Sequence, residues 1–313
     1  MIKSQFAIFS KLLILGLILS ACSVQNPATE GARVVASTTL VGDVVKQIGR
    51  DRISLTVLLP IGADPHTFEP RPQDAAALSD ARIIFLNGLE LEHSLEPIIE
   101  TNAKGIIVKV SDGIDALPFN ETPAKNNIST SDGTHQQAVG DPHTWMDPNL
   151  VIIWVQNITT SLSKADPANS AFYEANAKSY LIELSDLDLW IRSEVAGIPT
   201  EKRKLVTDHE SLGYFAHRYG FELVGLVVAS LSSNASPSAQ ELAILEDTIR
   251  QQGVSAIFVD TTVNPALAQQ VAQDTGVKLV PIYSGSLGDA NSGVTSYIQF
   301  MKANVKAIVE GLK

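Results

Sequence analysis

Residues 140–148 contain the motif from which we predict the fold, and they read Gly-Asp-Pro-His-Thr-Trp-Met-Asp-Pro. Its His143 follows Pro142, which restricts the backbone, and stands between two Asp-Pro turn signals. Residues 63–70, Ala-Asp-Pro-His-Thr-Phe-Glu-Pro, repeat the Asp-Pro-His-Thr core around His66. Two rigid loops that each present one imidazole are typical of a metal site. We therefore expect a fold that brings these loops together.

A third histidine, His209, follows Asp208 at the end of a short strand predicted at residues 204–207. This position corresponds to the end of a strand, where parallel sheets bind their ligands. Three neutral imidazoles with a fourth oxygen ligand or water would complete a tetrahedral zinc site. The other histidines that lie in predicted helices, His93 and His217, are expected to be surface or packing residues. The sequence therefore predicts a site made by His66, His143 and His209.

The first 22 residues have the organisation of a secretory signal. Two lysines precede an apolar run at residues 12–18, which is too short for a membrane span, and Leu-Ser-Ala-Cys follows at residues 19–22. This ending resembles a bacterial lipobox, so we expect cleavage before Cys22 and a lipid anchor on that cysteine. Residues 23–32 would form a tether to an extracytoplasmic protein anchored to a bacterial membrane, either periplasmic or at the cell surface.

Composition narrows the possible functions and metals. Cys22 is the only cysteine, so disulfides and thiolate metal ligands are excluded from the folded part of the protein. A transition-metal site must therefore use histidine and carboxylate ligands, which suit zinc or manganese. The formal net charge of −11 argues against a nucleic-acid partner, because no basic surface is available to neutralise phosphates. The length of 313 residues favours two domains.

Short apolar runs alternate with segments of helical periodicity in both halves of the chain. This alternation predicts parallel α/β sheets covered on both faces. In the first half the expected strands are residues 33–37, 53–59, 81–87 and 105–110, and the expected helices are residues 40–48, 71–79 and 92–101. In the second half the expected strands are residues 204–207, 222–228, 256–259 and 278–283, and the expected helices are residues 212–218, 238–252, 265–274 and 296–312.

A long helix is predicted between the two halves. Residues 169–196 contain no Pro or Gly, and Gly197 and Pro199 end the segment. Apolar residues recur every three or four positions, which predicts one buried stripe made by Ala177, Leu181, Leu184, Leu187, Ile191 and Val195. At 1.5 Å per residue the helix would be about 40 Å long. We expect two lobes, residues 33–163 and 200–313, each with a four-stranded parallel sheet and joined by one rigid helix within residues 164–199.

The order of the motifs resembles a known family. These motifs are the lipobox, the two Asp-Pro-His-Thr loops, Asn-Gly-Leu-Glu-Leu-Glu at residues 87–92, His209 with Gly-Tyr-Phe at residues 213–215, and Ala-Ile-Phe-Val at residues 256–259. The chain resembles the metal-binding lipoproteins of zinc and manganese ABC importers, the adhesin-like solute-binding proteins. The resemblance implies two α/β lobes with the metal in the cleft, ligands at His66, His143 and His209, and delivery of the metal to an ABC permease. We expect a monomer.

The fourth ligand is left open by two departures from the family pattern. Gly285 stands where the family often has an aspartate ligand, and Ser236 stands where it has a glutamate. Asp260, at a neighbouring strand end, is our first choice as ligand or outer partner, Asp289 is the second and a water is the third. The family resemblance implies that zinc members have a histidine at the position of His209. The absence of the anionic aspartate ligand at position 285 also favours binding of zinc over manganese.

Two other classes of protein are compatible with three histidines. A secreted zinc hydrolase would use an open metal position, with Asp208, Glu210 or Asp260 as general base. The sequence contains no His-Glu-x-x-His motif, which argues against this class. A surface adhesin or structural lipoprotein would use the metal only to stabilise its fold. We therefore predict a binding protein without enzymatic activity.

Overall fold

The structure is a computed structural model that describes residues 31–118, 140–228 and 236–313. Residues 32–313 form one compact unit. The predicted signal at residues 1–22, with Cys22, and residues 23–30 of the predicted tether lie outside the described residues. No helix of the described segments is long and apolar enough to cross a membrane.

Two four-stranded parallel sheets are present in the described part of the chain. The first has the order β2-β1-β3-β4 and consists of β1 (Ala32–Ala36), β2 (Ile53–Val57), β3 (Ile83–Leu86) and β4 (Ile106–Lys109). The second has the equivalent order β6-β5-β7-β8 and consists of β5 (Lys204–Thr207), β6 (Glu222–Leu226), β7 (Ala256–Asp260) and β8 (Lys278–Ile282). We call the parts built on these sheets the first and second lobes. The predicted two-lobe α/β fold is confirmed.

Helices cover both faces of each sheet, which explains why the central strands are apolar throughout. Alternate residues of β3 enter different cores, since Phe85 lies in a core shared with the second lobe and Ile84 packs beneath the helices of the first lobe. In β7, Phe258 enters the shared core and Ile257 a core confined to the second lobe. The helices around the lobe-specific cores are α3 (Pro72–Asp80), α4 (Glu96–Asn102), α8 (Ala239–Gln252) and α9 (Ala266–Thr275).

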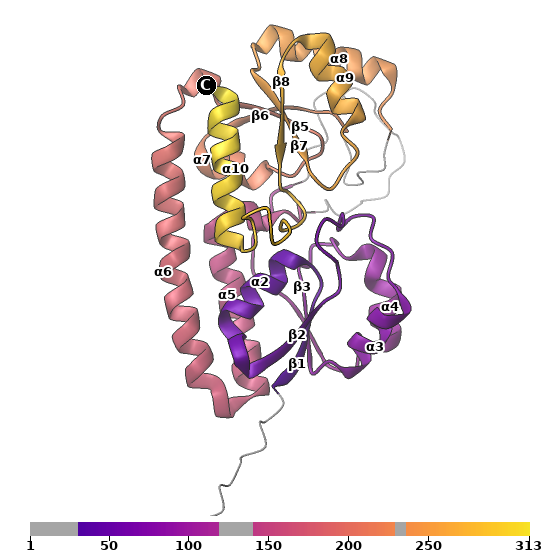
Figure 1. Cartoon of the computed structure of the whole chain (residues 1–313), viewed down its shortest axis with the longest axis vertical. Helices are drawn as coiled ribbons and strands as arrows, with labels where there is room; N and C mark the ends of the chain where they lie inside the picture. The colour runs from indigo at the N-terminus through magenta and orange to yellow at the C-terminus, as the bar shows by residue number, and fades with distance from the viewer. Residues whose placement is uncertain (1–30, 119–139, 229–235) are drawn as a thin grey trace, which may run out of the picture. The chain divides into compact units, whose positions relative to one another are not determined.

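The shared core joins the two lobes. It contains residues of five helices: α2 (Thr39–Gly49), α5 (Pro148–Ala165), α6 (Ser170–Val195), α7 (Gly213–Tyr219) and α10 (Tyr297–Leu312). The long helix α6 lies beside α2 and α5 of the first lobe and beside α10 of the second (Figure 1). Because one continuous apolar core includes both sheets, movement of one lobe against the other must rearrange packed side chains.

The predicted long helix is confirmed, with one change in its buried stripe. Tyr180 is buried on α6, whereas Leu181, which the periodicity included, is only half-buried. Neighbouring helix positions point about 100° apart, so one of the two must leave the buried face. The lobe boundaries at residues 163–164 and 199–200 stay predictions.

Most strands and helices begin and end within two residues of their predicted bounds. The helix expected over residues 92–101 is interrupted, because a 3₁₀ turn at His93–Leu95 precedes α4, which has Pro97 in its first turn. Proline lacks an N–H and is best tolerated at a helix start. The strand expected over residues 222–228 ends at Leu226.

Candidate metal centre

The two Asp-Pro-His loops use the same turn. In the loop after β2, Asp64 Oδ1 accepts a hydrogen bond from His66 N at 2.9 Å. In the loop before α5, Asp141 Oδ1 accepts one from His143 N, also at 2.9 Å. An aspartate that bonds the backbone two residues later forms an Asx turn, and the intervening proline restricts it further. The repeated sequence thus fixes the backbone beneath each imidazole.

The third imidazole comes from the second lobe. His209 lies just beyond the carboxyl end of β5 and is buried, with 4 % of its surface exposed. Its side chain meets those of His66 and His143, and the three offer nitrogen atoms that all lie within 4.8 Å of one another. The ring centroids are 5.1 to 5.7 Å apart. No other group of three potential metal-ligating His, Cys, Asp or Glu side chains is found in the described segments.

The nitrogen geometry suits a tetrahedral ion. His66 Nε2 and His143 Nε2 are 3.1 Å apart. Two nitrogens bound to zinc at 2.0–2.1 Å in a tetrahedral shell would be about 3.3 Å apart. A small adjustment of two side chains would therefore admit the ion. The structure brings together the three predicted histidines, and their role as ligands stays a prediction.

Carboxylates lie beside two of the three imidazoles. Asp141 Oδ1 lies 2.7 Å from His143 Nδ1, and both residues are buried. This contact fixes the proton on Nδ1 and leaves the lone pair of Nε2 for a metal. Asp208 Oδ1 lies 3.2 Å from His209 Nδ1 and forms an ion pair when that imidazole is protonated. Asp141 was not among the site residues predicted from the sequence, although it is the aspartate of the Asp-Pro-His repeat that contains His143.

The electrostatic environments of His66 and His209 are opposite. Burial lowers the pKa of His66, and the neighbouring His143 and His209 lower it further. Burial also disfavours protonation of His209, but the charge and contact of Asp208, together with Asp260 and Asp64, outweigh it and raise this pKa to about 9. Of these two imidazoles, His209 is therefore the one at which protons compete with a metal over the wider pH range.

Asp260, the predicted fourth ligand, lies at the end of β7 and close enough to His209 to affect its charge. It is not a member of the three-histidine group. Its Oδ2 accepts a hydrogen bond from Thr262 Oγ1 at 2.6 Å, and its Oδ1 accepts from the backbone N–H groups of Thr262 and Ser284. A Cβ at Gly285 would lie 3.6 Å from Asp260 Oδ2. The carboxylate of Asp260 thus lies beside Gly285, the position at which the family resemblance implied an aspartate ligand.

Gly285 is also required for close packing of the two lobes. A Cβ at this position would approach Pro65 Cδ to 2.7 Å, which is closer than side chains tolerate. Asp289, the second choice for the fourth ligand, is exposed, and its Oδ1 accepts hydrogen bonds from the backbone N–H groups of Asn291 and Ser292. Asp289 therefore stabilises the turn in which it lies.

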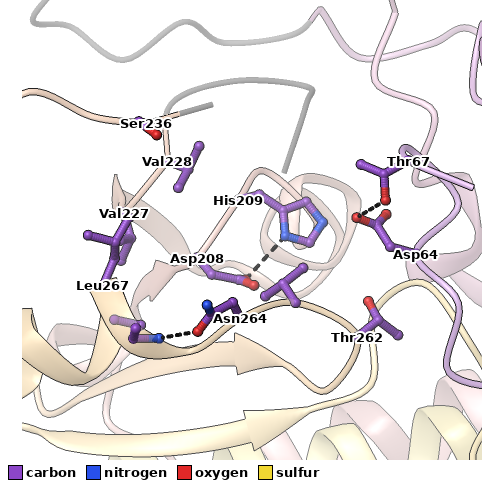
Figure 2. Close-up of a pocket in the computed structure, with 13 residues that line it drawn as sticks. Asp64, Thr67, Asp208, His209, Val227, Val228, Ser236, Thr262, Asn264 and Leu267 are labelled. Atoms are coloured by element: carbon purple, nitrogen blue, oxygen red, sulfur yellow. Dashed lines mark hydrogen bonds and ion pairs between the residues drawn. The ribbon is translucent and has the colours of Figure 1, made fainter. Parts of the chain in front are cut away.

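A cavity of about 340 Å³ opens beside His209 (Figure 2). Asp64 and Thr67 line it from the first lobe, and Asp208, Thr262 and Asn264 line it from the second. Oxygen atoms of this kind solvate hydrated cations well. Of the three histidines, His209 is the one that lines this cavity.

His93 and His217, which the sequence assigned to surface or packing positions, are exposed. His93 Nδ1 lies 3.0 Å from Glu96 Oε2, and 84 % of its side chain is exposed. Neither residue takes part in the three-histidine group. Both are therefore suitable control positions for mutagenesis.

Comparison with known proteins places the chain in a family. Residues 34–311 match the family model described as zinc-uptake complex component A, periplasmic. The chain belongs to this family. The relationship predicted from the motifs is thereby confirmed.

Individual relatives are similar over nearly their whole length. The chain is 35% identical to the manganese-binding lipoprotein MntA of Halalkalibacterium halodurans over 306 residues, which cover 96% of each chain. It is 32% identical to the manganese ABC transporter substrate-binding lipoprotein PsaA of Streptococcus pneumoniae over 313 residues, again 96% of each chain.

Two similar solved structures agree with the fold. The periplasmic zinc-binding protein TroA from Treponema pallidum superposes with a TM-score of 0.77 and 27% identity, over 90% of this chain and 99% of TroA. The Mn-bound periplasmic metal-binding protein from Candidatus Liberibacter asiaticus superposes with a TM-score of 0.76 and 26% identity, with the same coverage.

A conservative change at Asp141 tests how His143 is oriented. Asp141→Asn keeps an oxygen for the turn bond but removes the carboxylate charge beside Nδ1, so we expect metal affinity to fall about 10- to 100-fold. Competition titration with a chromogenic chelator measures this. Asp64→Asn is the comparison, because Asp64 makes the same turn bond but its second oxygen accepts a hydrogen bond from Thr67 Oγ1 at 3.2 Å, and its charge acts on His209. Equal losses in both variants would contradict a specific role for Asp141.

Proposed function

We propose that the chain is an extracytoplasmic solute-binding protein that captures one divalent transition metal ion between its lobes and delivers it to an ABC permease. The observation that carries this proposal is the convergence of three imidazole nitrogens within 4.8 Å from three separate loops. Membership of the zinc-uptake family supports it, as do relatives named as metal-binding lipoproteins. Capture and release would occur without catalysis, and the protein would act as a monomer.

We further propose zinc as the preferred ion, with manganese as the alternative. Three imidazoles suit zinc, whereas manganese favours carboxylate and other oxygen ligands. The relatives cited above include proteins named for each metal. We also propose that Cys22 carries a lipid that anchors the protein to a bacterial membrane, as the names of MntA and PsaA support.

Metal content and competition titration test this function. The purified protein, stripped of metal and then dialysed against zinc, is expected to retain one zinc ion per chain, and excess manganese should not displace it. Displacement of zinc by equimolar manganese would show that manganese is the preferred ion, but it would leave the proposed metal-binding function unchanged. Absence of stoichiometric binding of either metal would refute the function.

A separate prediction concerns the fourth ligand, for which we propose Asp260. Asp260→Asn keeps an oxygen that can accept from Thr262 N and Ser284 N but removes the anionic donor. Zinc affinity is expected to fall about 10- to 100-fold, less than for a lost imidazole, because the amide oxygen can still serve as a ligand. The control is Asp289→Asn, which should bind zinc like the unaltered protein. A loss of zinc affinity only in the Asp289 variant would make Asp289 the fourth ligand in place of Asp260. No loss of affinity in either variant would favour a water molecule as the fourth ligand.

A further inference from the structure

Trp145 connects the His143 loop to the second lobe. It lies in a 3₁₀ turn at Thr144–Met146, two residues after His143, and only 1 % of its surface is exposed. Its ring centroid is 5.1 Å from that of His143, with the rings edge to face. Its Nε1–H donates a hydrogen bond of 2.7 Å to the carbonyl oxygen of Ser284, which follows β8 of the second lobe.

The same segment of the second lobe holds Asp260. Ser284 N donates a hydrogen bond of 3.2 Å to Asp260 Oδ1, and both residues are buried. Ser284 therefore bonds Trp145 with its carbonyl and Asp260 with its N–H. A continuous series of contacts thus runs from the imidazole of His143 through the indole of Trp145 and the backbone of Ser284 to the carboxylate of Asp260.

The position of Trp145 is itself fixed from the second lobe. Its carbonyl oxygen accepts a hydrogen bond of 2.7 Å from Tyr297 Oη, at the start of α10. Tyr297 is completely buried. Two hydrogen bonds to different elements of the second lobe therefore hold one residue of the first lobe. Bonds of this kind are costly to break in a buried place, because the freed carbonyl cannot reach water.

We propose that Trp145 is a positioning residue of the metal centre. Its N–H holds the Ser284 segment in place, so that the carboxylate of Asp260 keeps its position at the end of β7, and its ring supports His143. The residue does not contact the metal itself. This inference rests on the proposed metal binding and on Asp260 as the fourth ligand.

A matched pair of variants tests the role of the N–H group. Trp145→Phe removes the donor but keeps an aromatic ring. Trp154→Phe is the comparison: Trp154 is equally buried and packs edge to face against Trp145, with ring centroids 6.3 Å apart, but its Nε1–H donates to Ser111 Oγ at 3.1 Å within the first lobe and not to the second lobe. We expect Trp145→Phe to weaken zinc binding about tenfold, within the range for outer-shell partners, and Trp154→Phe to change it less than about threefold. Equal effects of the two variants would overturn the proposal.

A double-mutant cycle tests whether Trp145 acts through Asp260. If it does, Trp145→Phe should weaken zinc binding far less in the Asp260→Asn background than in the unaltered protein. Simple multiplication of the two losses would refute the connection. If the unaltered protein binds zinc but neither Trp145→Phe nor the cycle has an effect, only this inference fails. If the unaltered protein binds no metal, the proposed function fails first.

Spectroscopy supplies a readout that general destabilisation does not reproduce. The chain has three tryptophans, at positions 145, 154 and 190. Because Trp145 packs against His143, zinc binding should change near-UV circular dichroism in the unaltered protein, in Trp154→Phe and in Trp190→Phe. The change should be lost in Trp145→Phe at saturating zinc. Retention of the full change there would contradict the contact.

A second variant keeps the proposal testable if Trp145→Phe does not fold. Tyr297→Phe removes only the hydroxyl that bonds the Trp145 carbonyl. We expect zinc affinity to fall several-fold. Unchanged affinity, together with an unchanged near-UV response to zinc, would show that the position of Trp145 does not depend on this bond and would refute the proposed support.

Discussion

Replacement of His143 by alanine is expected to lower zinc affinity by at least about 10²-fold, because loss of a ligand should exceed the 10- to 100-fold loss typical of outer-shell partners. His143 is the most constrained of the three imidazoles. Its backbone is held by the Asx turn, its Nδ1 by Asp141 and its ring by Trp145. An imidazole already fixed in its binding orientation loses little entropy when the metal binds.

Thermal unfolding provides a second readout for His143→Ala. A metal that binds only the folded state raises stability with its concentration above the dissociation constant. Saturating zinc should therefore raise the melting temperature of the unaltered protein and leave that of the variant nearly unchanged. The control is His93→Ala, since His93 is exposed and contacts only Glu96 among the described side-chain partners. A zinc-dependent shift of full size in His143→Ala would contradict its assignment as a ligand.

The second large expected effect is a rise in metal affinity with pH up to about pH 9. The pKa of His209 is raised to about 9 in the metal-free protein, so this imidazole carries a proton at neutral pH. A metal must displace that proton before it can bind. Below pH 9 affinity should therefore rise about tenfold per pH unit for one displaced proton, and about 100-fold between pH 6 and pH 8. His66, with its lowered pKa, adds little to this slope near neutral pH.

The aspartate beside His209 provides the control for this prediction. In Asp208→Asn the imidazole loses the partner that most strongly raises its pKa, so the range in which affinity changes should move toward the ordinary histidine pKa near 6.5. Affinity measured against a chelator buffer between pH 6 and pH 9 should then flatten above about pH 7. A flat profile in the unaltered protein over the same range would refute proton competition at His209.

Local sequence was sufficient to predict much of this protein. The two Asp-Pro-His-Thr loops indicated the candidate metal site because an Asx turn with proline depends on neighbouring residues alone. The period of apolar residues predicted α6, and apolar runs predicted the two four-stranded sheets. The interruption before Pro97 was missed, although the proline itself was a local signal for it.

Other properties depend on residues distant in sequence, and only the tertiary structure decided them. The raised pKa of His209 results in part from Asp260, at the end of β7, and from Asp64, in a loop of the first lobe, and the lowered pKa of His66 results from burial and two other histidines. The bond from Trp145 to Ser284 spans 139 positions of the chain. Local patterns specify turns and periodicity, whereas burial, charge and hydrogen bonds across the lobes depend on how those elements pack. The sequence alone therefore determined which residues could bind a metal, and the packing of the two lobes decided how each one is oriented and charged.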